Sequence, residues 1–362
     1  MNMKAHARTT RIAAILLGLV AAIVLAGIGP APQATSAENE QAVKASALRT
    51  EAGEIKLSGP YTHKNLTVYL IHGEDRIKDK EFVTLQEALE LKKITIYETG
   101  NVNSLIVENN SDLVIYIHSG DIIKGGKQDR MVPHDIILPP RCGKITISVF
   151  CVEQGRWRQR GKENVAAFTE SGNAVAGREL KLAARLTGEQ REVWDKISKE
   201  QAKLTVSAGL RVETLESSSS MELTLSDKKV QDAAEEYIKA LSGIIEGKKD
   251  AIGFVFAING KPNSADVYAC NSLFRKLWPK LIKAASIEAV AEYRKDQTFK
   301  EVAADAIKEF MADAEKGKKT SKEVAKDVTM EVRETKENVL FRTRAAGAAK
   351  EYDDVHTNYV RK

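Results

Sequence analysis

Cysteine is scarce in this 362-residue chain, and its number and spacing limit its structural use. Cys142, Cys151 and Cys270 are the three present, and an odd number is not a disulfide framework of the kind found in small secreted domains. Cys142 and Cys151 flank one predicted strand, which at about 3.3 Å per residue holds them roughly 30 Å apart, beyond disulfide reach. We therefore expect small buried side chains, with a bridge open only to Cys270.

Familiar metal and nucleophile motifs are missing as well. His118 and His134 do not form a His-x-His or His-Glu-x-x-His pattern, and the chain has no Cys-x-x-Cys pair. The Gly-x-Ser-x-Gly elbow of serine hydrolases is also absent. We expect no metal ion and no bound cofactor, and we interpret the two histidines as structural.

Long apolar runs are missing after residue 28, which makes the one at the start informative. Lys4, Arg8 and Arg11 precede an uncharged apolar run over residues 12–28, and residues 30–37 are mostly small. This order is typical of a signal peptide, so we predict a leader over residues 1–37 and export to the periplasm, the bacterial envelope or the medium. The alternative is an uncleaved membrane anchor, because the run is near the shortest length that spans a bilayer.

Strong net charge is missing from the rest of the chain. The formal charge is +5, and subtracting the three basic residues of the leader leaves +2. Nucleic-acid binding depends on dense lysine and arginine, so this balance gives no reason to expect it. After leader cleavage we expect no membrane contact, and the sequence indicates no protein partner.

The patterns that are present predict an α+β, or mixed α/β, fold. We expect a flexible tether over residues 38–54. Residues 55–160 carry short β-branched runs, such as 66–72 and 144–152, and predict a strand-rich subdomain, sandwich-like or jelly-roll-like. Residues 161–362 show helical spacing over 230–245 and predict a helix-rich subdomain with a few strands, packed with the first as one unit.

Three local features of the second subdomain lead to definite expectations. Pro279 should kink its helix or begin a new one. Thr298 and Glu301 fit a capping box that opens the next helix. The basic segment 316–322 is expected to be a loop.

A glycine-rich segment between predicted strands is the first candidate site. Paired glycines let backbone N–H groups approach an anion closely, and neighbouring basic side chains add charge. A P-loop is excluded, because Gln128 stands where that motif needs a hydroxyl. The alternative is a tight turn with solvated charges. The candidate ligand-binding residues are Gly125, Gly126, Lys127, Gln128, Arg130 and Arg156.

Three carboxylates at predicted strand ends are the candidate catalytic residues. Glu98, Asp121 and Glu153 would form an acid/base group if their side chains converged. Ion pairs with Arg130 or Arg156 are the simpler interpretation.

Several long motifs, in order, resemble the ARG and rhodanese-phosphatase-superfamily-associated protein domain over about residues 55–285. They are Glu98-x-Gly100-x-Val102-Asn103-x-Leu105, Gly125-Gly126-Lys127-Gln128-Asp129-Arg130, Val149-Phe150-Cys151-Val152-Glu153-x-Gly155-Arg156-Trp157, Phe256-Ala257-Ile258-Asn259-Gly260 and Leu273-Phe274-Arg275-Lys276-Leu277-Trp278-Pro279. The resemblance implies no established activity. The family's name implies association with ADP-ribose-processing and phosphatase-type proteins, which fits an anionic, nucleotide-like ligand.

These observations lead to one main functional hypothesis and two alternatives. The main hypothesis is an exported ligand-binding or regulatory domain for a small anionic molecule at the glycine segment. One alternative is a hydrolase or transferase that uses Glu98, Asp121 or Glu153 as acid or base. The other is an envelope scaffold, which requires an exposed apolar patch around Trp157 and Trp278.

Overall fold

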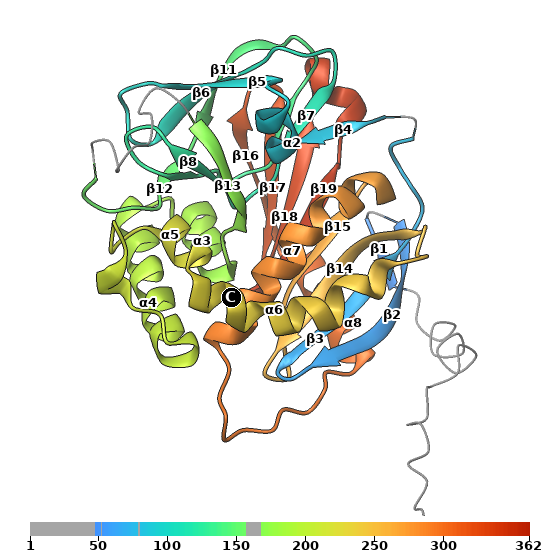
Figure 1. Ribbon diagram of the computed structural model, residues 1–362. Helices are drawn as coiled ribbons and strands as arrows, with labels where there is room; N and C mark the ends of the chain where they lie inside the picture. The colour runs from blue at the N-terminus through green and yellow to red at the C-terminus, as the bar shows by residue number, and fades with distance from the viewer. Residues whose placement is uncertain (1–47, 52, 79, 157–167) are drawn as a thin grey trace, which may run out of the picture.

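The computed structural model describes residues 48–51, 53–78, 80–156 and 168–362 (Figure 1). The predicted leader lies outside the described residues, as does Trp157. The first described strand, β1 (Leu48–Thr50), begins within the segment expected to be a tether. No helix in the described ranges is long and apolar enough to cross a membrane.

A nine-stranded sheet joins both ends of the chain. Each neighbouring pair of its strands is antiparallel. Its order is β1, β2 (Gly53–His63), β3 (Leu66–His72), β14 (Ala251–Ile258), β15 (Lys261–Tyr268), β19 (His356–Arg361), β18 (Asn338–Ala345), β17 (Val328–Glu334) and β16 (Lys318–Ala325). The pairing of β3 with β14 therefore joins the first part of the chain to the last.

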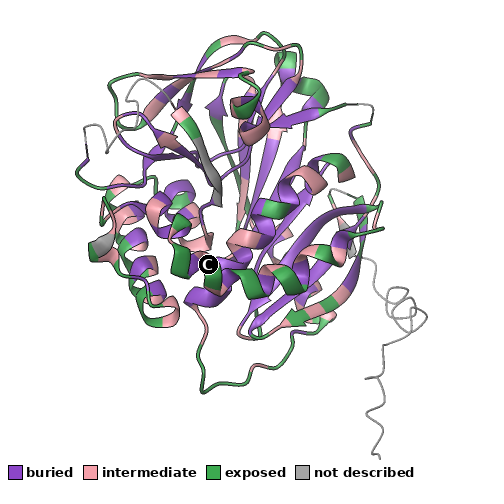
Figure 2. Cartoon of the chain, viewed as in Figure 1, coloured by how far each residue is buried: buried purple, intermediate pink, exposed green. Residues whose placement is uncertain are grey.

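Apolar residues on the two faces of this sheet build two cores. On one face, residues such as Leu70 and Phe254 pack with α6 (Lys228–Leu241) and α7 (Asn271–Ala291). On the other face, Tyr69 and Val255 pack with α8 (Ala304–Glu315). Figure 2 shows the central strands buried and the exposed residues gathered on the outward sides of the helices.

Three small sheets form the upper part of Figure 1. One contains β10 (Ile136–Leu138), β7 (Val114–Ile117) and β4 (Phe82–Thr84), and another contains β11 (Gly143–Ser148), β6 (Ser104–Asn109) and β5 (Ile94–Glu98). The third contains β12 (Phe150–Cys151), β9 (Arg130–Met131), β8 (Asp121–Gly125) and β13 (Phe168–Val175). The short helix α2 (Leu85–Glu90) begins with the predicted capping box of Thr84 and Glu87.

Most of the remaining helical segments are short. They are α3 (Arg178–Leu182), a π-helical turn (Ala183–Thr187), α4 (Gln190–Ala208) and α5 (Met221–Ser226), with 3-10 turns at Val212–Thr214, Ser242–Ile245 and Gly347–Tyr352. The α+β class, with a strand-rich first half and helices in the second, is confirmed. All three cysteines are free, Cys151 and Cys270 buried and Cys142 half-buried.

Two local expectations are wrong and a third is wrong in part, each for a physical reason. No new helix begins at Pro279, which lies inside α7, where the packing of a mostly buried helix outweighs one lost backbone hydrogen bond. The basic segment is the edge strand β16, a position where exposed lysines prevent pairing with another chain. The helix expected from Thr298 begins at Ala304, and Glu301 instead accepts a hydrogen bond from Thr62 at 2.7 Å.

The close approach of β14 to β15 gives a stability test. A Cβ on Gly253 would lie 2.1 Å from the carbonyl oxygen of Asp266. We expect Gly253→Ala to lower the free energy of unfolding by about 1–3 kcal/mol, measured by urea denaturation. Gly243→Ala is the matched control, because its Cβ would meet nothing within 4 Å. Equal effects of the two substitutions would contradict this packing.

Candidate functional site

The glycine segment forms the turn between β8 and β9. Gly125 and Gly126 have φ values of +113° and +56°. A Cβ on Gly126 would lie 2.5 Å from Oε1 of Glu98, so the turn needs glycine there. The expected close approach exists, and the partner that approaches is a carboxylate of the protein itself.

The polar groups of this turn bind other groups of the chain. The N–H of Lys127 donates to Oε1 of Glu98 at 2.9 Å, and the N–H of Gly125 donates to Oδ1 of Asp129 at 3.1 Å. The side-chain amide of Gln128 donates to the carbonyl of Glu153 at 2.9 Å. The protein's own carboxylates and carbonyl thus occupy donors that were expected to hold an anion.

Two arginines bring the predicted carboxylates together. Arg156 Nε lies 2.5 Å from Glu153 and its Nη2 lies 3.4 Å from Asp129, while Arg130 lies 3.9 Å from Glu98. Arg130, Asp129 and Glu153 are fully buried and Arg156 nearly so. We call these five residues the loop cluster. Glu98 and Glu153 therefore reach one charged group, and their catalytic role stays a prediction.

Asp121 does not join that group. It begins β8, so its Cα is about 13 Å along the strand from Gly125. Its side chain pairs with Lys280 at 2.5 Å and accepts the backbone N–H of His118 at 2.9 Å. The three carboxylates singled out in the sequence do not converge.

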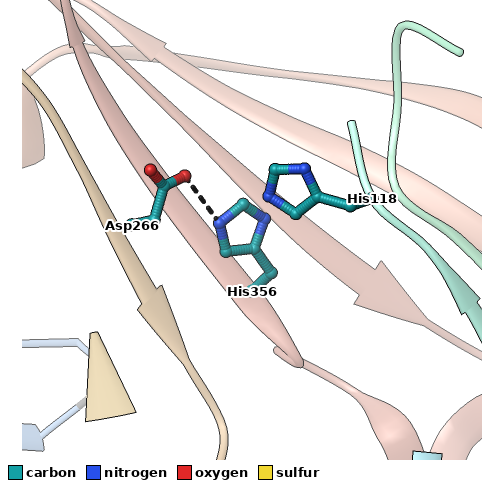
Figure 3. Close-up of side chains that lie close together, drawn as sticks. All are labelled: His118, Asp266 and His356. Carbon is teal, nitrogen blue, oxygen red and sulfur yellow. Dashed lines mark hydrogen bonds and ion pairs between the residues drawn. The ribbon is translucent and has the colours of Figure 1, made fainter. Parts of the chain in front are cut away.

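A second buried polar group lies where the small sheets meet the large one. His356 on β19 has Nδ1 2.8 Å from Asp135 and Nε2 3.0 Å from Asp266, as Figure 3 shows for Asp266. His118 Nε2 is 2.9 Å from the hydroxyl of Tyr268, whose ring stacks on His356 at 4.5 Å. We call these five residues the histidine hub.

The two histidines of the hub have opposite electrostatics. Burial lowers the pKa of His356, but the carboxylates of Asp135 and Asp266 outweigh it and the net pKa is raised. Burial is the main cause that places the pKa of His118 well below its usual range, and Lys181 adds to the effect. His356 therefore has a carboxylate at each ring nitrogen, whereas the charged form of His118 is strongly disfavoured.

The hub resembles a metal site in its residue types. His118, Asp266 and His356 each offer one ligand atom, and these atoms lie within 4.8 Å of one another. The ligand atoms already face other partners: Asp135 and Asp266 for His356, and Tyr268 for His118. The charge of Lys181 also acts on His118. We interpret the hub as a hydrogen-bonded ion network and infer no metal ion from it.

A basic stripe on α3 and the π-helical turn lies beside the hub. Arg178, Lys181 and Arg185 follow helical spacing and so project from one side. Arg185 donates to the side-chain oxygen of Asn358 at 2.7 Å and to the carbonyl of Pro133 at 2.9 Å. The sequence reasoning missed this stripe, although its spacing was a readable signal. Asp135, Asp266 and His356 gave no such signal, because they are far apart in the chain.

An open cleft of about 570 Å³ lies at one end of the large sheet, and we call it the sheet-end cleft. Its walls come from α3, α4, the β14–β15 turn, the end of α7 and the end of β19. The side chain of Asn263 is buried there, and its Oδ1 has no hydrogen-bond partner in the described ranges. The charged lining residues are Arg178, Lys203, Lys261, Arg294, Arg361 and Lys362, against Glu179, Glu200, Glu288 and Glu292.

Two carboxyl groups of this cleft are hard to ionise. Burial raises the pKa of Glu200 to about 8, and repulsion from Glu288 and Glu292 on α7 adds to the rise. Burial also raises the pKa of Glu288, which accepts the backbone N–H of Arg178 at 3.1 Å. Glu200 is therefore mostly protonated at pH 7. The net charge of the cleft is then more positive than its six basic and four acidic side chains indicate.

Breaking the loop cluster should be costly. Glu153→Gln leaves the guanidinium of Arg156 with less negative charge in a buried site, so we expect a loss of about 3–5 kcal/mol in unfolding free energy. Asp112→Asn breaks the exposed pair with Arg141 and should cost at most about 1 kcal/mol. Denaturant titration of both variants measures the difference, and a similar small effect for both would refute the burial argument.

Glu200 should make stability depend on pH. The folded-state pKa, about 8, exceeds the ordinary value of 4.5, so the unfolded chain releases this proton first and stability falls as pH rises between the two values. Glu200→Gln should remove that fall. The melting temperature of the variant should exceed that of the wild type at pH 8.5 and match it near pH 4.5. A constant difference across this range would contradict the assignment.

The comparisons with known proteins agree with the sequence motifs. No curated protein and no solved structure matches the chain significantly. The family model of the ARG and Rhodanese-Phosphatase-superfamily-associated Protein domain, ARPP-1, matches residues 54–360, which spans the large sheet from β2 to β19. The chain therefore belongs to the ARPP-1 domain family.

Proposed function

We propose that the protein binds a small anionic molecule in the sheet-end cleft. The observation that carries this proposal is a hollow of about 570 Å³ with six basic and four acidic side chains in its lining. That volume is within the usual range for small-molecule sites. Because Glu200 is largely neutral at pH 7, the positive charge exceeds the negative further.

A buried oxygen of the sheet-end cleft, without a hydrogen-bond partner among the described residues, restricts the chemistry of the ligand further. The buried Oδ1 of Asn263 is an acceptor that gains a hydrogen bond from a ligand donor. Nδ2 of the same side chain is 3.3 Å from Glu288. A ligand with an acidic group and a nearby hydroxyl or amine therefore fits the cleft best.

This proposal keeps the predicted class of ligand and moves its site. The glycine segment was the expected location, but Lys127 and Gly125 donate to Glu98 and Asp129 there. The cleft instead presents Lys261 and Arg361, which lie on the adjacent strands β15 and β19. We infer further that the protein works after export, on the basis of the basic, apolar and small-residue order of residues 1–37.

A hydrolase or transferase is the second candidate function. It is favoured by the meeting of Glu98 and Glu153 with two arginines, which supplies carboxylates and positive charge in one buried group. Asp121 is not part of this second candidate function, because it pairs with Lys280 away from the loop cluster. The envelope-scaffold hypothesis requires an exposed apolar patch that includes Trp278. Trp278 is buried and its indole N–H donates to the carbonyl of Ser242, so it is not part of such a patch.

Thermal shift with defined anions tests the proposed function. We expect phosphate, ADP-ribose or a small hydroxy acid such as lactate to raise the melting temperature, because a ligand that binds only the folded state stabilises it. The double variant Lys261→Glu/Arg361→Glu should lose this shift.

The matched control is Lys127→Glu on the glycine segment, which should keep the shift. A shift lost in Lys127→Glu and kept in the double variant would place the ligand at the glycine segment instead. No shift with any anion at millimolar concentration would refute anion binding.

A further inference from the structure

Lys181 lies beside a small cavity next to the histidine hub. The cavity has a volume of about 20 Å³, and its wall includes Lys181, Asp266, Asn358 and Glu288. Arg178 and Glu288 line both this cavity and the sheet-end cleft. The two hollows are thus neighbours that share these two side chains, and Lys181 lines the smaller one.

The amine of Lys181 differs from the other lysines around α7. Lys280 pairs with Asp121 at 2.5 Å, and Lys276 pairs with Glu87 at 3.2 Å. Lys181 Nζ makes no hydrogen bond or ion pair with any described residue. Its amine is therefore not held by a carboxylate, and partial burial disfavours the charged form.

The electrostatics agree with this geometry. Burial lowers the pKa of Lys181, and Arg185 adds to the effect while Asp266 and Glu288 oppose it. A neutral lysine amine is a nucleophile towards carbonyl groups. Glu288 lies in the same cavity wall, and burial raises the pKa of its carboxyl group.

The backbone makes room for the lysine stem. Gly120 has a φ of +92°, and a Cβ there would lie 2.6 Å from Cε of Lys181 and 3.1 Å from Cγ1 of Val175. Gly120 therefore allows the side chain to lie against the backbone between β7 and β8. The lysine stem therefore passes close to Gly120, and the same residue lines the cavity.

We propose that Lys181 forms an imine with the carbonyl group of a small anionic aldehyde or keto acid whose acidic group is held in the sheet-end cleft. This inference rests on the proposed function, because the cleft must first bind the anion. The cavity has room for little more than one water-sized group, so the carbonyl end must be as small as an aldehyde or a methyl ketone. Glyoxylate and pyruvate are suitable probes.

The chemistry is a condensation that releases water. Nζ of Lys181 attacks the carbonyl carbon, a C–N bond forms, and the carbonyl oxygen takes a proton to give a carbinolamine. The hydroxyl then takes a proton from water, so the C–O bond breaks and water departs. The nitrogen electron pair forms the C=N bond, and loss of the second amine proton gives the neutral imine.

Reductive trapping tests the inference on the full chain. The protein is incubated with glyoxylate or pyruvate and sodium borohydride, digested and analysed by mass spectrometry. We expect the peptide that contains Lys181 to gain the mass of the probe less one oxygen atom. Lys181→Met should lose the adduct, and Lys239→Met, an exposed substitution on α6, should keep it.

A thermal-shift measurement with lactate separates this inference from the proposed function. Lactate carries the same acidic group without a carbonyl, so it should stabilise both wild type and Lys181→Met. A lactate shift without any trapped adduct overturns the imine and leaves anion binding intact. Trapping at Lys203 or Lys261 in place of Lys181 also overturns it. No shift and no adduct overturns both.

Discussion

The buried contact of His356 with Asp135 and Asp266 is the interaction on which the rest of the structure depends. Asp135 also accepts hydrogen bonds from the hydroxyl of Tyr116 at 2.9 Å and of Thr343 at 2.5 Å. One carboxylate thus connects β7 of a small sheet with β18 and β19 of the large sheet. Buried charges are stable only when paired and hydrogen-bonded, so this contact fixes how the two parts of the protein fit together.

The sheet-end cleft depends on the same arrangement. Asn358 follows His356 by two residues on β19, so both side chains project to the same face and Asn358 donates to Asp266 at 2.9 Å. Arg185 reaches Asn358 from the π-helical turn, which positions α3 and its basic stripe beside the cavity. Turns of this kind occur often at functional sites. Polar contacts thus run from the histidine hub through Asn358 and Arg185 to α3, whose Arg178 lines the sheet-end cleft.

Local periodicity in the sequence predicted most strands and helices, because β3, β14 and α6 each bury a regular apolar pattern. It failed where tertiary contacts override local signals, as in β16, whose first six residues are exposed, and in the helix start considered at Pro279, which lies inside α7. Of the candidate site, the sequence correctly indicated that Glu98 and Glu153 approach the glycine turn. It could not indicate the hub, since Asp135 and His356 are more than two hundred residues apart and belong to parts of the chain in different sheets.

A crystal structure of the protein grown with lactate tests the central claim most directly, because it shows where an anion binds. The account predicts the carboxylate of lactate in the sheet-end cleft, within hydrogen-bond distance of Arg178, Lys261 or Arg361, and its hydroxyl on Asn263. Lactate bound at Gly125 to Arg130, with the cleft holding water alone, would contradict it.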